Sequence, residues 1–256
     1  MKERQITVNS AGRRLYGMAH YPGGEKEKYP AAVFFHGLTG TSIEPHRLFV
    51  KIARNLAGRG IAAVRFDFCG AGQSEGDSGE TGFYDWVRDA ESILDFIRND
   101  RRLDSDNLSA IGLSMGGAVL MYLLAGKKIN TEKNVFLSPA VMLKELIAGM
   151  KENNRTENGC LIFNGSRISL KAVEETGKID LFSMDYEKTG PSLIMHSRDD
   201  KTVPFKVSET LDEFFGDKGI KTELVLLDNS GHTFDIPSSE DAVIEKVSTW
   251  LAGESG

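Results

Sequence analysis

Short apolar runs that alternate with helix-like segments constrain the fold of this chain more than any other feature. Residues 31–35 form an unbroken apolar run directly after Pro30, and a second strand-like stretch follows at 62–68. Such runs are typical of strands buried on both faces of a sheet. Over residues 83–97, apolar side chains recur three and four positions apart, which predicts a helix packed on that sheet. The alternation predicts an α/β fold with a mostly parallel central sheet and helices on both faces.

One interval, residues 141–191, breaks this alternation. The interval is weakly patterned, and a structureless loop of that length is improbable inside a compact domain. Because 256 residues suit one large α/β domain, we expect a single domain over 1–256 with a small cap inserted at 141–191. The other strands are expected at 4–9, 15–21, 108–113, 135–137, 193–196 and 223–227, and the other helices at 46–57, 115–126, 204–215 and 239–251.

The charge and the apolar content narrow the class of protein. The formal net charge is −6 and the basic residues form no stripe, so no nucleic-acid partner is expected. The first ten residues carry no apolar signal core, and no apolar run is long enough to span a bilayer. We therefore expect a cytoplasmic protein without a membrane partner, with Cys69 and Cys160 as free thiols. Composition leaves a homodimer open.

Residues 112–116 read Gly-Leu-Ser-Met-Gly, a G-x-S-x-G pattern between an expected strand and an expected helix. Glycines permit the sharp turn of this motif because they present no Cβ, and the turn lifts Ser114 above the carboxyl edge of the sheet. Met115 begins the helix, so its free N–H can donate to an oxyanion. We interpret Ser114 as the nucleophile of a serine hydrolase; the alternative is a tight turn with an idle serine.

A serine hydroxyl is a poor nucleophile until a base takes its proton. Of the five histidines, His196 and His232 follow Ser114 in the chain. His196 ends an expected strand and suits a structural or loop-packing role. His232 lies in a glycine-bearing loop after the last strand, at the same sheet edge as Ser114, and is the predicted base. A surface loop histidine is the alternative.

The acid of a triad should follow the preceding strand, and both Asp199 and Asp200 do. A carboxylate at that place can accept from the imidazole Nδ1–H, which fixes the tautomer and stabilises the imidazolium. Spacing alone leaves the two aspartates open.

Two further loops follow buried strands. The loop 36–40 is expected to supply the second oxyanion donor, the Leu38 N–H, with Gly37 allowing close approach and His36 organising the loop. The glycine-rich loop 67–74 has neither the P-loop lysine nor the third glycine of G-x-G-x-x-G, so we interpret it as a tight turn. No Cys/His cluster has zinc spacing and no calcium loop is present, so neither a metal nor a cofactor is expected.

Together these residues resemble a bacterial α/β-hydrolase of the feruloyl/cinnamoyl esterase-like group. The resemblance implies that the acid is Asp200, through the D-x-x-V-P pattern at 200–204, and that the oxyanion donors are Leu38 and Met115. It also implies a small cap over the acyl pocket at 141–191. The motifs are specific for the superfamily and only suggestive for the substrate. The likeness covers nearly the whole chain and rests on segments 36–40, 66–74, 112–117, 200–204 and 231–232.

The resemblance implies hydrolysis of a small carboxylic ester, such as a hydroxycinnamoyl (feruloyl) ester, through an acyl-enzyme and without a cofactor. In the cap, Asp185 and Tyr186 are candidates for holding a phenolic hydroxyl, or equally for stabilising the cap. The alternative enzyme is a lipase- or thioesterase-like hydrolase of aliphatic acyl groups; some peptidases share the motifs. A non-catalytic binding protein of the same fold is disfavoured because all three triad residue types are present.

Overall fold

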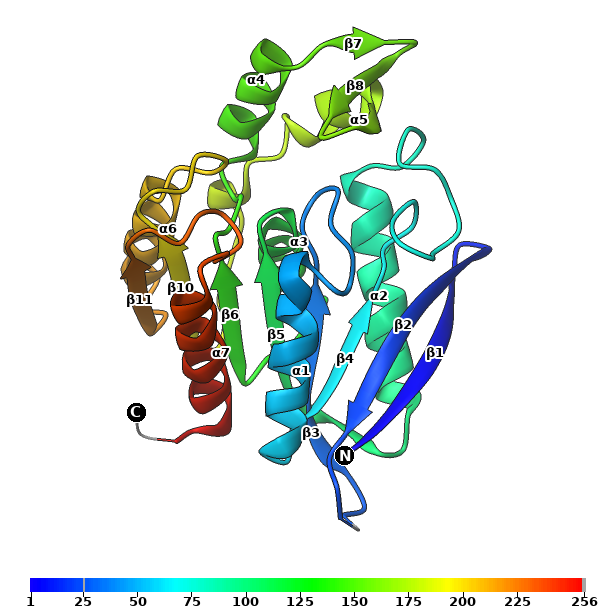
Figure 1. Ribbon diagram of the computed structural model, residues 1–256, viewed down its shortest axis with the longest axis vertical. Helices are drawn as coiled ribbons and strands as arrows, with labels where there is room; N and C mark the ends of the chain where they lie inside the picture. Colours follow the sequence, from blue (N-terminus) through cyan, green and yellow to red (C-terminus); the bar gives the residue numbers. More distant parts are fainter. Residues whose placement is uncertain (25, 255–256) are drawn as a thin grey trace.

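The computed structural model describes residues 1–24 and 26–254. Its main sheet has eight strands in the order β1-β2-β4-β3-β5-β6-β10-β11 (Figure 1). These are β1 Lys2–Ser10, β2 Arg13–Tyr21, β3 Tyr29–Phe35, β4 Ala62–Phe66, β5 Leu103–Leu113, β6 Lys133–Leu137, β10 Ser192–Ser197 and β11 Thr222–Leu227. β2 runs antiparallel to both β1 and β4, and the remaining neighbours are parallel. The predicted mostly parallel sheet is confirmed.

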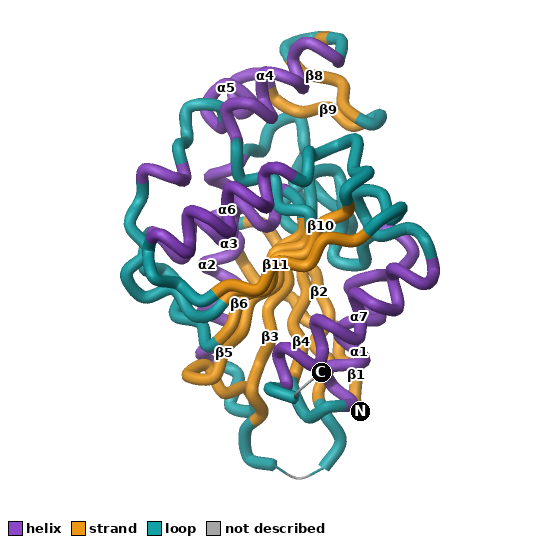
Figure 2. The backbone as a smooth tube through the Cα atoms, turned by 90° about the vertical axis from the view of Figure 1, so that its left-hand side faces the viewer, coloured by secondary structure: helices purple, strands orange, loops and turns teal. Residues whose placement is uncertain are grey.

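Helices cover both faces of this sheet, as the side view in Figure 2 shows. They are α1 Leu48–Gly58, α2 Phe83–Asn99, α3 Met115–Ala125, α6 Lys206–Asp217 and α7 Pro237–Ala252. On one face, α1 and α7 contribute Phe49 and Val247 to a shared apolar core. On the other face, Trp86 of α2, Leu120 of α3 and Leu211 of α6 belong to a second core. Within the described residues, no helix is long and apolar enough to cross a bilayer.

The helix expected at 46–57 begins later than its apolar pattern suggests. Residues Pro45–Arg47 form a 3-10 turn, in which His46 has φ 44° and Arg47 has φ 65°. A right-handed helix cannot run through residues in left-handed conformations, so α1 starts at Leu48. The His46 ring is held from outside this segment, because its Nδ1 lies 2.7 Å from Glu240 Oε1 of α7.

Between β6 and β10 the chain forms a small unit of its own beyond the carboxyl ends of the parallel strands (Figure 1). Its strands form a separate antiparallel sheet, and its core includes Ile147, Leu161 and Val173. The strands are two to four residues long, too short to show a period in the sequence. The elements are α4 Leu143–Asn153, β7 Thr156–Glu157, β8 Cys160–Phe163, β9 Ser166–Ser169, α5 Leu170–Thr176 and the 3-10 turn η2 Leu181–Ser183.

Candidate active site

Ser114 occupies a strained turn between β5 and α3. Its φ of 52° and ψ of −119° lie in a region that residues with a Cβ rarely adopt. The flanking glycines make the turn feasible: a Cβ at Gly112 would lie 2.6 Å from Gly116 O, and one at Gly116 would clash with Phe35 O. The turn is the geometry expected for G-x-S-x-G at a strand–helix junction.

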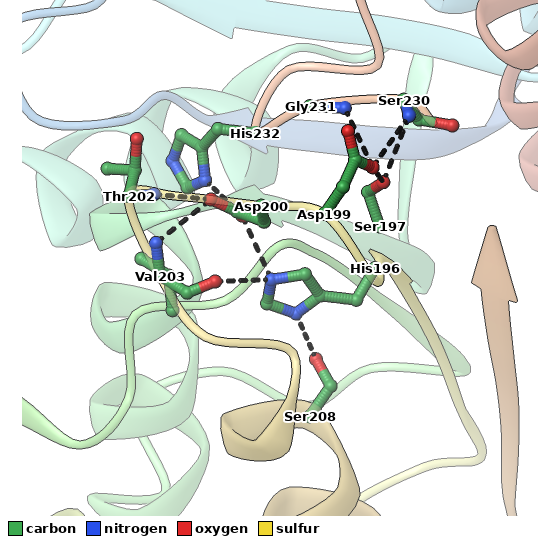
Figure 3. Close-up of polar contacts among 10 residues, drawn as sticks. All are labelled: His196, Ser197, Asp199, Asp200, Thr202, Val203, Ser208, Ser230, Gly231 and His232. Atoms are coloured by element: carbon green, nitrogen blue, oxygen red, sulfur yellow. Dashed lines mark hydrogen bonds and ion pairs between the residues drawn. The ribbon is translucent and has the colours of Figure 1, made fainter. Parts of the chain in front are cut away.

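His232 and Asp200 form the shortest polar contact among the predicted site residues. His232 Nδ1 donates to Asp200 Oδ2 over 2.6 Å (Figure 3). The other carboxylate oxygen, Oδ1, accepts from the N–H groups of Thr202 at 2.7 Å and Val203 at 2.9 Å. With Nδ1 protonated, His232 Nε2 keeps a lone pair that can accept a proton.

A second histidine also contacts this carboxylate. His196 Nε2 lies 2.9 Å from Asp200 Oδ2 and 3.0 Å from Val203 O, and its Nδ1 lies 2.7 Å from Ser208 Oγ. Because both partners of Nε2 are acceptors, Nε2 carries the proton and Ser208 donates to Nδ1. Burial by itself would raise the pKa of Asp200, but hydrogen bonds from His196 and His232 hold it well below its ordinary value. The interpretation of His196 as a structural or loop-packing residue did not include this contact with Asp200.

Asp199 faces a different group of atoms. Its Oδ1 accepts from the N–H groups of Ser230 at 2.9 Å and Gly231 at 3.4 Å, and from the Ser197 hydroxyl (Figure 3). The hydrogen bond from Ser197, followed by that from Ser230, lowers the pKa of Asp199. The geometry therefore separates the two aspartates: Asp200 contacts His232, and Asp199 anchors the loop that carries it.

Ser114 and His232 line one cavity of about 250 Å³, here called the central cavity. Leu38 and Met115, the expected oxyanion donors, line the same cavity. Among the described residues, Ser114 and His232 form no hydrogen bond with each other. Catalytic hydrogen bonds are often long or poorly aligned before substrate binds. The structure thus brings five of the seven predicted site residues to one place.

Two further cavities adjoin the central one. The first, here called the apolar pocket, has a volume of about 180 Å³ and shares Leu38, Met115 and Met150 with the central cavity. Phe83 and Trp86 are among its walls, and none of its lining residues is charged. The second, here called the open groove, has a volume of about 870 Å³ and shares Thr202 and Val203 with the central cavity. Its wall includes Glu145, Asn153, Asn154, Asn164, Lys201, Lys206 and Thr210.

Asp185 and Tyr186, the other two predicted residues, line none of these cavities. Tyr186 is 2% exposed; its hydroxyl donates to Leu181 O over 2.7 Å, and its ring packs against Phe214. Asp185 is exposed and lies 3.8 Å from Lys127 Nζ. Because both side chains have partners within the protein, their positions favour the alternative role of stabilising the cap over that of holding a substrate hydroxyl.

The loops at 36–40 and 67–74 are organised by their own side chains. His36 Nε2 accepts from Phe68 N–H at 3.0 Å, so its Nδ1–H donates to Gly37 O at 2.8 Å. In the glycine-rich loop, Asp67 accepts from Gln73 N–H at 3.0 Å, and a Cβ at Gly72 would clash with the Asp67 carboxylate. The loop therefore closes around the Asp67 carboxylate. The described part of the chain contains no cluster of three or more metal-ligating side chains.

Known proteins resemble this chain in sequence and in fold. Residues 27–161 match the family described as Serine aminopeptidase, S33, which covers more than half of the chain, including Ser114. Est1E from Butyrivibrio proteoclasticus, solved with bound ferulic acid, superposes with a TM-score of 0.83 at 23% identity over 97% of this chain and 98% of its own. The α/β-hydrolase GrgF from Penicillium sp. sh18 superposes with a TM-score of 0.76 at 14% identity, over 99% of both chains.

A sequence relative matches a shorter stretch. The multifunctional-autoprocessing repeats-in-toxin of Vibrio vulnificus is 27% identical over 124 residues. That stretch is 46% of this chain and 2% of the toxin, so the chain spans a very small part of that protein's length. From the family match and the superpositions, the chain has the α/β-hydrolase fold and belongs to the serine aminopeptidase S33 family.

Proposed function

We propose that this protein is a serine esterase that cleaves small carboxylic esters through an acyl-enzyme. The observation that carries the proposal is the His232–Asp200 hydrogen bond at the edge of the central cavity, which Ser114 also lines. Ser114 Oγ attacks the ester carbonyl while His232 Nε2 takes its proton. His232 then gives this proton to the departing alcohol, and the same imidazole activates the water that releases the acid.

The oxyanion of each tetrahedral intermediate accepts hydrogen bonds from the Leu38 and Met115 N–H groups. Met115 is the first residue of α3, so its N–H has no partner within the helix. The positive end of the helix dipole adds to the attraction for the oxyanion. Both residues line the central cavity beside Ser114, which supports this assignment.

The direction of proton transfer indicates which adjoining cavity takes the alcohol and which takes the acyl group. His232 must reach the leaving oxygen, so the alcohol departs on the side of the acid loop, toward Thr202 and the open groove. The acyl group then lies on the side of Leu38 and Met115, in the apolar pocket. Residues 141–191 act as a cap in this proposal, because Ile168 and Val173 of this segment form part of the wall of that pocket.

A pocket walled by Phe83 and Trp86 suits a flat, aromatic acyl group such as hydroxycinnamoyl. The ferulic acid bound by Est1E is in keeping with this choice. A lipase- or thioesterase-like hydrolase of long aliphatic chains would need a longer channel than a pocket of about 180 Å³. An aminopeptidase would need a carboxylate for the substrate ammonium, and none lines the apolar pocket.

Two measurements test the proposal. A fluorophosphonate probe should label the wild-type protein and leave Ser114→Ala unlabelled, whereas a non-catalytic binding protein would leave both unlabelled. A panel of methyl ferulate, methyl cinnamate, p-nitrophenyl acetate, a long-chain alkyl ester and an aminoacyl anilide then ranks the substrate classes. Preference for the long-chain ester or the anilide over both cinnamoyl esters would contradict the proposed acyl group.

A further inference from the structure

Glu44 is a buried acid beside the expected oxyanion loop, and the mechanism above does not use it. The residue is 6% exposed, and its Oε1 accepts from Gly37 N–H at 2.6 Å. Its backbone, at φ 58° and ψ 161°, lies in a region essentially reserved for glycine. The strained backbone and the buried acid each destabilise the fold, and residues of this kind are typical of functional sites.

The hydrogen bonds around Gly37 explain what this acid holds. Gly37 O accepts from His36 Nδ1–H at 2.8 Å and from Gly40 N–H at 3.1 Å. In a trans peptide the C=O and the following N–H point in opposite directions. Fixing Gly37 O therefore directs the Leu38 N–H, and Glu44 fixes the other end of the same residue, its N–H.

Glu44 also packs closely against the loop at Gly40. A Cβ at Gly40 would lie 2.7 Å from Glu44 Oε1, so the carboxyl fits against a bare glycine backbone. The far end of the loop is held independently: Ser42 N–H donates to Asp67 Oδ1 at 2.7 Å, and Ser42 O accepts from Arg65 at 3.1 Å. At the end that carries Leu38, Glu44 restrains the Gly37 N–H, while His36 and Gly40 restrain the Gly37 carbonyl.

No cation contacts Glu44 among the described residues, and the charged groups of the elements around it have other partners. His36 binds backbone atoms, Asp67 and Arg65 bind Ser42, and His46 pairs with Glu240. Burial accordingly raises the pKa of Glu44 to about 7, against the opposing effect of the Gly37 N–H. Both the acid and the carboxylate can accept this hydrogen bond.

We propose that Glu44 is a positioning residue, which holds the Gly37–Leu38 peptide so that the Leu38 N–H meets the oxyanion formed on Ser114. This inference rests on the proposed esterase function. Since the hydrogen bond acts on the loop and does not touch the substrate, its loss should weaken binding of the oxyanion and leave binding of the ester ground state almost unchanged.

Glu44→Leu and Glu44→Gln test the inference, because leucine removes the acceptor and glutamine keeps one. With p-nitrophenyl acetate, Glu44→Leu should lower kcat about 10- to 100-fold with KM changed less than about threefold, as for a displaced oxyanion donor. Its affinity for an aryl trifluoromethyl ketone, which forms an oxyanion on the serine, should fall by a similar factor. Glu44→Gln should restore kcat to within about threefold of wild type.

A matched control separates positioning from loss of a buried acid. Asp89 is also buried and accepts a backbone N–H at 2.7 Å, that of Cys69, which belongs to a different loop from Leu38. Asp89→Leu should lower the melting temperature while kcat on p-nitrophenyl acetate stays within about threefold. Full kcat in Glu44→Leu, or a loss of kcat with unchanged ketone affinity, would overturn the inference. A wild-type protein that neither cleaves esters nor reacts with fluorophosphonate would instead overturn the proposed function on which it rests.

Discussion

Asp200 Oδ2 accepts hydrogen bonds from two imidazoles, from His232 Nδ1 at 2.6 Å and from His196 Nε2 at 2.9 Å. With Oδ1 bound to the N–H groups of Thr202 and Val203, the carboxylate has four donors. Its side chain is fully shielded from solvent, whereas the His232 side chain is partly exposed. A carboxylate fixed in this way can orient the His232 ring without itself taking up a proton.

The first prediction concerns Ser114 and His232. Because the nucleophile and the base act as one unit, Ser114→Ala and His232→Ala should each lower kcat by roughly 10⁶. The double variant should then be little worse than either single variant. Steady-state kinetics on p-nitrophenyl acetate measure both effects, and near-normal turnover by Ser114→Ala would refute the mechanism.

The second prediction separates Asp200 from Asp199. Asp200→Asn should lower kcat by about 10⁴, since an amide does not hold His232 in the required tautomer. Asp199→Asn changes a residue that binds the loop at Ser230 and Gly231, so its effect on kcat should be far smaller. The two variants differ by one position and preserve side-chain volume, which makes each the control for the other. The reverse ranking of kcat would assign the acid to Asp199.

Sheet topology explains how much of the site could be predicted. β10 and β11 are parallel neighbours, with Ser197 opposite Leu227, so the residues that follow them emerge side by side. That relationship follows from the strand pattern, and it brings His232 to the aspartates. Spacing does not distinguish Asp199 from Asp200. Successive residues in a turn point in different directions, and the sequence does not show which of the two faces His232. The hydrogen bonds distinguish them in the structure, and their catalytic roles stay predictions.

Other features had no usable signal in the sequence. The Tyr186 hydroxyl donates to Leu181 O, which allows this side chain to be buried in an irregular stretch. The sequence around Tyr186 has no periodicity that would predict this local contact. Glu44 lies in a polar loop where an acid is usually solvated, and only the folded chain closes the loop over it. α1 starts later than its apolar pattern predicts because His46 and Arg47 adopt left-handed conformations, which residue type does not reveal.

The third prediction is a dependence of stability on pH that comes from Glu44. Its pKa rises from 4.5 in the unfolded chain to about 7 in the folded one. The native state therefore holds the proton more tightly, and this contribution is complete below pH 4.5 and is lost as the pH rises through 7. From these two pKa values it amounts to about 3 kcal/mol.

Glu44→Gln has no such ionisation and serves as the reference. The free energy of unfolding of wild type minus that of Glu44→Gln should fall by about 3 kcal/mol between pH 4.5 and pH 8. Urea unfolding followed by circular dichroism at several pH values measures this difference. Parallel curves for the two proteins would show that Glu44 ionises in the folded protein as it does in the unfolded chain.

The last prediction tests which cavity receives the acyl group. Val173 of α5 lines the apolar pocket, and Thr210 of α6 lines the open groove. Val173→Trp should fill much of the pocket, because about 180 Å³ leaves little room for both an indole and a substrate ring. Thr210→Trp adds a similar bulk on the leaving-group side and is the matched control.

Since a single extra methylene in a tight pocket changes kcat/KM by about 10- to 200-fold, Val173→Trp should lower it on methyl ferulate by at least about 50-fold. On p-nitrophenyl acetate, whose acetyl group needs no pocket, the change should stay below about threefold. Thr210→Trp should leave methyl ferulate almost unaffected and should discriminate against ferulate esters of bulky alcohols. If Val173→Trp instead slowed both esters equally, the cap would support the fold without selecting the acyl group. If only Thr210→Trp lowered kcat/KM on methyl ferulate, the acyl group would lie in the open groove. The chemistry at Ser114 is common to both variants, and only the obstructed cavity differs between them.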